Sequence, residues 1–121
     1  MKLVSTLFVS LGLLLAAALV SPVEDKDICK SSICVVEFNA SFNAQNGVPW
    51  IESLKDCEAS RVDIVSDPDL QKEHRIVVVP TIVLFSEGEE VKRFQANIMM
   101  TMEATKDDVQ EPIDEVLMSD F

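Results

Sequence analysis

The sequence has few of the residues that metal sites and catalytic triads require. Its 121 residues include one His, three Cys, one Trp and no Tyr. A transition-metal site normally takes three or four ligands such as His and Cys, so this composition leaves little room for one. A catalytic triad would depend on His74 alone. We therefore expect no metal and no other cofactor.

Positive charge is also scarce. Ten Lys and Arg residues stand against 21 Asp and Glu residues, for a net charge of −11. Binding to nucleic acid or to an anionic membrane surface depends on cations, so we expect no nucleic-acid partner. The hydrophobic fraction of 48% is nevertheless too high for a disordered chain, and the length fits a single domain.

The first residues have the pattern of a targeting segment. Lys2 precedes an apolar run over 3–15, and the three alanines at 16–18 offer a small-residue cleavage site. We predict a signal peptide over residues 1–18, with cleavage within three residues of its end. The alternative is an uncleaved N-terminal anchor, which is the only arrangement in which we expect contact with a membrane.

Export places the rest of the chain in the periplasm or outside the cell, where disulfides persist. We divide it into a lead-in segment over 19–32 and a folded domain over 33–121. Three cysteines follow the signal peptide: Cys29, Cys34 and Cys57. Because three is an odd number, one thiol is left over or joins a second chain.

The hydrophobic pattern predicts alternating strands and helices. The expected strands cover 33–38, 61–65, 76–85 and 91–96, and the expected helices cover 49–57, 67–74 and the residues that follow Thr105. Pro112 predicts a kink or a late start in the last helix. Elements in this order favour a compact α/β sandwich.

Pro80 lies inside the most strand-like run of the chain. Proline cannot donate to a sheet ladder, so we expect the strand to begin at Thr81. Val79-Pro80-Thr81 and the run V-E-F-N-A-S-F over 36–42 together resemble the thioredoxin family. The family's matching strand reads V-D-F-W-A-x-W, and its cis-proline precedes the central antiparallel strand.

The resemblance covers about residues 33–117. It implies a thioredoxin-like sandwich, in which a central mixed β-sheet is flanked by helices, here shortened at the N-terminus. It also implies a cis bond before the proline and a peptide-binding groove beside the loop that carries it. The walls of this groove would be Phe42, Asn43, Trp50, Val79 and Pro80.

The chain departs from the family at the redox motif. Where the family has C-G-P-C, this chain has Asn43-Ala44-Gln45-Asn46, and Asn43 and Asn46 cannot supply the two thiols that exchange requires. We expect this site to be inactive. Glu37 aligns with the family's buried acid, but a strand carboxylate satisfied by Lys or by water explains it equally well.

The cysteines are expected at the end of the sheet opposite that motif. We predict a structural disulfide that joins Cys34 to Cys29 or to Cys57, because such a bond would stabilise a shortened domain. The alternative is a reactive pair formed by Cys29 and Cys34.

Two functions of different class remain. The main hypothesis is a non-catalytic module, not an enzyme, that binds a protein or an extended peptide in the groove or serves as a structural subunit. The alternative is a thiol–disulfide oxidoreductase that uses Cys29 and Cys34 as a displaced pair.

Three weaker signals complete the sequence. Asn39-Ala40-Ser41 is an N-glycosylation sequon, which matters only in a eukaryotic host. His74 is expected on a solvent-facing helix without a chemical role. The methionine-rich run over 98–102 either extends the groove or fills a gap under the last helix.

Overall fold

The structure is a computed structural model that describes residues 28–119. The predicted signal peptide over 1–18 and most of the lead-in lie outside the described residues. Among the residues that are described, no helix is both long and apolar enough to cross a membrane.

A sheet of four strands forms the centre of the fold, in the order β2-β1-β3-β4. β1 pairs in parallel with β2 and antiparallel with β3, and β3 pairs antiparallel with β4. The strands are β1 (Ile33–Asn39), β2 (Glu58–Asp63), β3 (Thr81–Ser86) and β4 (Glu89–Gln95). The sheet is therefore mixed, as expected.

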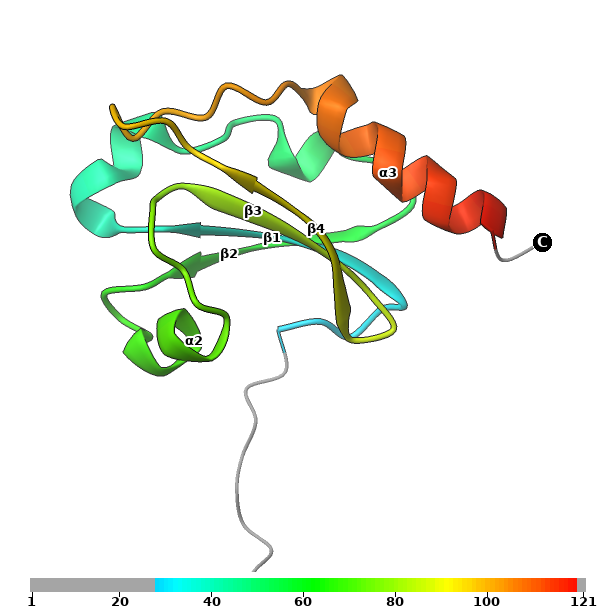
Figure 1. The fold of residues 1–121 in the computed structure, drawn as a ribbon, viewed down its shortest axis with the longest axis horizontal. Helices are drawn as coiled ribbons and strands as arrows, with labels where there is room; N and C mark the ends of the chain where they lie inside the picture. The colour runs from blue at the N-terminus through cyan, green and yellow to red at the C-terminus, as the bar shows by residue number, and fades with distance from the viewer. Residues whose placement is uncertain (1–27, 120–121) are drawn as a thin grey trace, which may run out of the picture.

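Helical segments cover both faces of this sheet (Figure 1). α2 (Pro68–Glu73) lies on one side, and α3 (Lys106–Ser119) lies on the other with the 3-10 segments η1 (Ser41–Asn46) and η2 (Ile51–Ser53). The flanking helices and the mixed sheet confirm the predicted α/β sandwich.

β1 is buried on both faces, which explains its continuous apolar sequence. Alternate side chains enter two separate core clusters, because successive residues of a strand point to opposite faces. Ile33 and Val35 pack on the side of α3, with Ile113 of that helix. Val36 and Phe38 pack on the opposite side.

The helix predicted over 49–57 is wrong. Val48, Ile51 and Leu54 are the buried residues of this segment, and their spacing is three residues. That spacing matches the three residues per turn of a 3-10 helix, and η2 is the short 3-10 turn that results. The next strand, β2, begins at Glu58, three residues earlier than expected.

The remaining element boundaries follow local signals closely. β3 begins at Thr81, directly after a cis Val79–Pro80 bond. Thr105 caps α3, because its hydroxyl accepts a hydrogen bond from the backbone N–H of Asp108 at 3.2 Å. Pro112 lies buried inside α3, which begins at Lys106, so the proline does not delay the helix.

Candidate functional site

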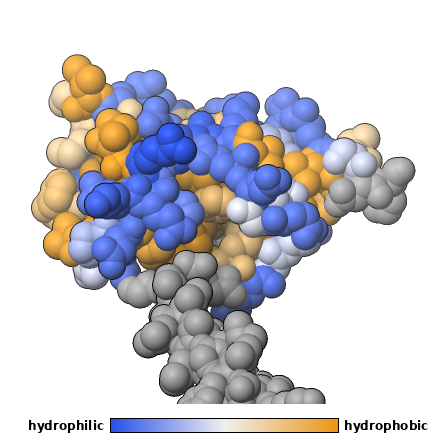
Figure 2. All heavy atoms as spheres, turned by 60° about the horizontal axis from the view of Figure 1, so that its bottom comes forward, coloured by the Kyte–Doolittle hydropathy of each residue, from blue (hydrophilic) through white to orange (hydrophobic). Residues whose placement is uncertain are grey.

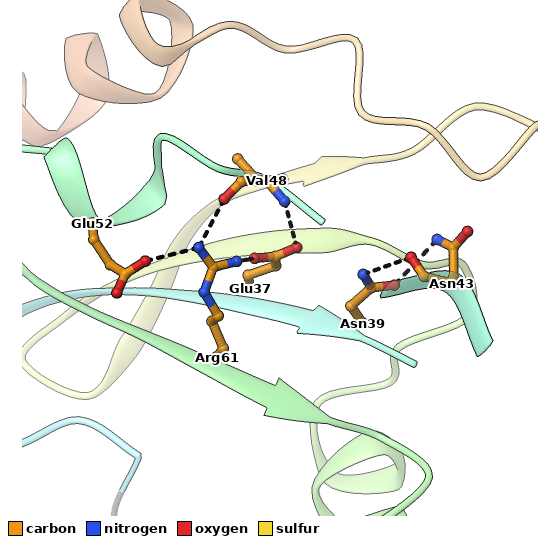
Figure 3. Close-up of polar contacts among 6 residues, drawn as sticks. All are labelled: Glu37, Asn39, Asn43, Val48, Glu52 and Arg61. Carbon is orange, nitrogen blue, oxygen red and sulfur yellow. Dashed lines mark hydrogen bonds and ion pairs between the residues drawn. The ribbon is translucent and has the colours of Figure 1, made fainter. Parts of the chain in front are cut away.

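The carboxyl end of β1, where the family's motif would lie, holds a cluster of asparagine side chains (Figure 3). Asn43 is 1% exposed. The two N–H groups on its Nδ2 are shared among three acceptors: Asn39 Oδ1 at 3.2 Å, the carbonyl of Val79 at 3.5 Å and that of Met100 at 3.1 Å. Its Oδ1 accepts from Asn46 Nδ2 at 2.8 Å.

These contacts give Asn43 a structural role at this end of the sheet. One amide ties η1 to the loop before β3 and to the loop before α3. An amide nitrogen has no nucleophilic pair to offer in disulfide exchange, so positions 43 and 46 carry no thiol chemistry. The same cluster involves Asn39, whose Nδ2 donates to the carbonyl of Asn43 at 3.2 Å. Glycosylation of Asn39 would modify this same nitrogen. In the structure, the nitrogen is engaged in the hydrogen bond to Asn43.

A shallow pocket of about 310 Å³ lies beside the asparagine cluster. Its lining includes Phe42 and Val79, together with Ile64, Gln71, Val77, Val78, Asn97, Ile98 and Met100. Asn43 is buried and is not among the lining residues, and Trp50 packs against the core cluster that contains Ile113 of α3. Of the five residues predicted to form the groove, Phe42 and Val79 line this pocket, and Trp50 is not among the lining residues.

Exposed apolar side chains gather at this end of the molecule, at the left of Figure 2. They are Phe42, Val77, Ile98, Met99 and Met100. The methionine-rich run over 98–102 is only partly exposed. Its last methionine, Met102, packs against the core cluster under α3.

Glu37 lies in the middle of β1 and is 1% exposed (Figure 3). Its Oε2 accepts a hydrogen bond from the backbone N–H of Val48 at 2.9 Å, and its Oε1 forms an ion pair with Arg61 of β2. Arg61 also donates to the carbonyl of Val48 at 3.0 Å and to Glu52 at 2.9 Å. The partner is thus an arginine and a backbone amide, rather than the lysine or water expected.

Burial sets the protonation behaviour of this carboxyl group. Removal from water raises the pKa of Glu37 above its ordinary value, even though the N–H of Val48 and the guanidinium of Arg61 act in the opposite direction. Through its contacts with Val48 and Arg61, Glu37 links β1 to the segment before η2 and to β2.

The prediction that His74 lies on a solvent-facing helix is wrong. Its side chain is 16% exposed, and its ring centroid lies 5.4 Å from those of Phe38 and Phe85. The end of α2 folds back onto the sheet, so the imidazole fills part of the core on that face.

The amino end of β1 holds a disulfide. A disulfide joins Cys29 to Cys34, with the two Cα atoms 5.7 Å apart. Cys34 is the second residue of β1 and is 1% exposed. Cys29 is half-buried and packs with Ile28 against the core cluster to which Cys34 belongs. Cys29 is therefore the more exposed residue of the pair.

The loop between the two cysteines is held from both sides. Ser31 Oγ donates to Glu58 Oε1 at 3.0 Å, and Glu58 is the neighbour of Cys34 in the parallel pairing. On the other side, the backbone N–H of Glu87 donates to the carbonyl of Ser32 at 2.8 Å. Both disulfide sulfurs lie near the carbonyl oxygen of Ser31, at 3.1 and 3.4 Å.

Cys57 is the cysteine left outside the disulfide. It directly precedes β2 and packs against the core cluster on the α3 side, whereas Cys34 belongs to the cluster on the other face. Burial, and to a smaller extent the charge of Asp56, raises the pKa of its thiol. Within residues 28–119, no group of three His, Cys, Asp or Glu side chains could hold a metal ion.

Comparisons with known proteins identify the fold. No family model matches the chain, and no curated protein matches it. Among solved structures, a point mutant of a thioredoxin from Halobacterium salinarum is 21% identical, with a TM-score of 0.59 over 70% of this chain and 74% of the other. A thioredoxin from Fasciola hepatica is 24% identical, with a TM-score of 0.56 over 71% and 82%. One from Plasmodium falciparum is 16% identical, with a TM-score of 0.56 over 73% and 85%.

These similarities establish that the chain has the thioredoxin-like fold, as its sequence predicts. The main functional hypothesis, a non-catalytic module without the redox-active C-x-x-C pair, is wrong. It took the predicted disulfide of Cys34 to be structural only, but the bond joins Cys34 to Cys29, which is the pair that the alternative function requires. This finding supports the alternative function.

Proposed function

We propose that the protein is a thiol–disulfide exchange module whose working pair is Cys29 and Cys34. The observation that supports this function best is the disulfide between a half-buried cysteine and a buried one, in a thioredoxin-like fold. The pair lies at the amino end of β1, and the usual motif positions at the carboxyl end hold amides.

The difference in burial assigns a separate role to each sulfur. Cys29 is the exchanging sulfur, because it is the accessible one of the two. Cys34 is the resolving sulfur, because it lies in β1 and is closed off from a large partner. Access to the attacked sulfur is one of the factors that determine exchange rates.

The reaction then runs through one mixed disulfide. A thiolate of a partner dithiol attacks Cys29 Sγ, the bond between Cys29 and Cys34 breaks, and Cys34 leaves as a thiolate that takes a proton from solvent. The second thiolate of the partner attacks its own bridged sulfur and releases Cys29. The partner dithiol is oxidised to a disulfide, and the cysteine pair gains two electrons and two protons. The reverse sequence reduces a partner disulfide.

The proposed partner is a protein or extended peptide that carries such a dithiol or disulfide. The proposed location is the periplasm or the exterior of the cell, after cleavage of the segment over 1–18. Mass measurement of the protein recovered from its host tests the cleavage directly, because loss of about 18 residues is expected.

Reduction of insulin by dithiothreitol tests the function. We expect the wild-type domain to accelerate insulin precipitation and both Cys29→Ser and Cys34→Ser to fall to the uncatalysed rate. Cys57→Ser is the matched control, because it removes a half-buried cysteine that lies outside the disulfide, and it should retain the wild-type rate.

Trapping experiments separate the two sulfurs. With a disulfide-bonded peptide as probe, Cys34→Ser should accumulate a mixed disulfide on Cys29, whereas Cys29→Ser should form little adduct because Cys34 is buried. Equal trapping by the two variants would contradict the assigned roles. No acceleration of insulin reduction by the wild type would contradict the function itself.

A further inference from the structure

One side-chain hydrogen bond outside the cysteine pair helps to hold the exchange loop, beside the backbone bond from Glu87 to Ser32. The loop runs from Cys29 to Cys34, and its middle residue Ser31 donates a hydrogen bond to Glu58 on the neighbouring strand at 3.0 Å. The carbonyl oxygen of the same Ser31 lies 3.1 Å from one sulfur and 3.4 Å from the other. The contact to Glu58 therefore fixes the residue around which both sulfurs are arranged.

We infer that Glu58, acting through Ser31, is a positioning residue for thiol–disulfide exchange at Cys29 and Cys34. This inference rests on the proposed function and adds to it a residue that holds the two sulfurs together when their bond is open. In this role Glu58 acts through its hydrogen bond to Ser31. Its carboxylate keeps the loop in the conformation in which the disulfide closes.

The physical basis is pre-organisation of the reduced loop. Closing a disulfide costs conformational entropy, and the cost is smaller when the intervening residues are already ordered. Ser31 lies inside the ring that the disulfide closes, and β2 anchors Glu58 beside Cys34 through the strand pairing. Loss of the tether frees the reduced loop more than the oxidised one, so the disulfide becomes less stable relative to the dithiol.

An effect of the negative charge of Glu58, rather than of its hydrogen bond, would give a different pattern across variants. Glu58→Gln keeps an oxygen acceptor for Ser31 but removes the negative charge, whereas Ser31→Ala keeps the charge but removes the hydrogen bond. Glu58→Ala removes both. If the role is positioning, Ser31→Ala and Glu58→Ala change together and Glu58→Gln resembles the wild type.

The test is the equilibrium constant for disulfide closure, measured by thiol trapping in dithiothreitol buffers of defined ratio. We expect Ser31→Ala and Glu58→Ala each to lower this constant about fivefold, which corresponds to about 20 mV in reduction potential. The double variant should fall no further than either single variant, because both remove the same bond. Glu58→Gln should stay within twofold of the wild type.

Glu89→Ala is the matched control. Glu89 is an exposed carboxylate at the same end of the sheet, since it pairs with Ser86, which in turn pairs with Ile33. We expect no change in the closure constant. An unchanged constant in Ser31→Ala, or an equal loss in Glu58→Gln and Glu58→Ala, would overturn the inference.

The outcome remains separable from that of the proposed function. Closure constants are measurable in strong dithiol buffer even for a disulfide that never acts on insulin. A wild type inactive on insulin, with the fivefold shifts present, would refute the exchange function alone. An active wild type with unshifted variants would refute the positioning role alone.

Discussion

The two ends of β1 are held by different kinds of contact. At the carboxyl end, Asn43 joins three segments through neutral hydrogen bonds and is sealed from solvent. At the amino end, a half-buried Cys29 is joined to a buried Cys34 in a loop tied to its neighbours. The comparison shows that this thioredoxin-like sheet has a buried amide network at the carboxyl end of β1 and a disulfide at the amino end.

The largest effect is expected at the asparagine end. Asn43→Ala should lower the free energy of unfolding by about 3 kcal/mol, because it strands the carbonyls of Val79 and Met100 and the amide of Asn46. The reduction potential of the cysteine pair should not change. Urea unfolding gives the first quantity and thiol trapping the second. The exposed neighbour Gln45→Ala is the control, and a shifted potential in Asn43→Ala would break the separation of the two ends.

The next effect belongs to the cysteine end. Cys29→Ser should lower the free energy of unfolding by about 2 kcal/mol relative to the oxidised wild type, because the ring it opens is short. Reduced wild-type protein should match the variant in the same urea titration. A loss of more than twice this value, or a variant less stable than the reduced wild type, would show that Cys29 contributes through packing rather than through the bond.

Glu37 lies between the two ends and makes stability depend on pH. Its pKa is raised in the folded state, so the folded protein holds the proton more tightly than the unfolded chain. Its contribution is present below the ordinary value of 4.5 and is lost as pH rises through the folded pKa. In urea titrations from pH 4 to 8, the wild type should lose stability relative to Glu37→Gln as pH rises. A difference that grows in the opposite direction would contradict the dominance of burial.

The smallest effect lies away from both ends, at the start of α3. Thr105→Ala should cost about 1 kcal/mol by removing the cap on the N–H of Asp108. Both the closure of the cysteine pair and the asparagine contacts should persist, as monitored by thiol trapping and amide exchange. Thr105→Ser, which keeps the hydroxyl, should restore most of the lost stability.

Much of the fold could be predicted because its signals are local. The apolar run of β1, the proline before β3 and the capping threonine before α3 each act within a few residues. The helix predicted over 49–57 was wrong because the periods of a 3-10 helix and an α-helix, 3.0 and 3.6 residues, differ little over so short a segment.

The site was harder to predict because it depends on contacts between distant segments. The pairing of Glu37 with Arg61 needs the parallel register of β1 and β2. The position of His74 needs the packing of α2 on the sheet. The sequence alone left the partner of Cys34 open, because the bond to Cys29 depends on how the lead-in segment folds against β1.

The most direct test of the central claim is the reduction potential of the pair formed by Cys29 and Cys34. Thiol trapping in a series of glutathione and dithiothreitol buffers, on a Cys57→Ser background, measures it without interference from the third thiol. The exchange function predicts equilibrium between about −120 and −270 mV, the range of working thiol–disulfide proteins. Reduction only below about −300 mV would mark a structural disulfide and contradict the account.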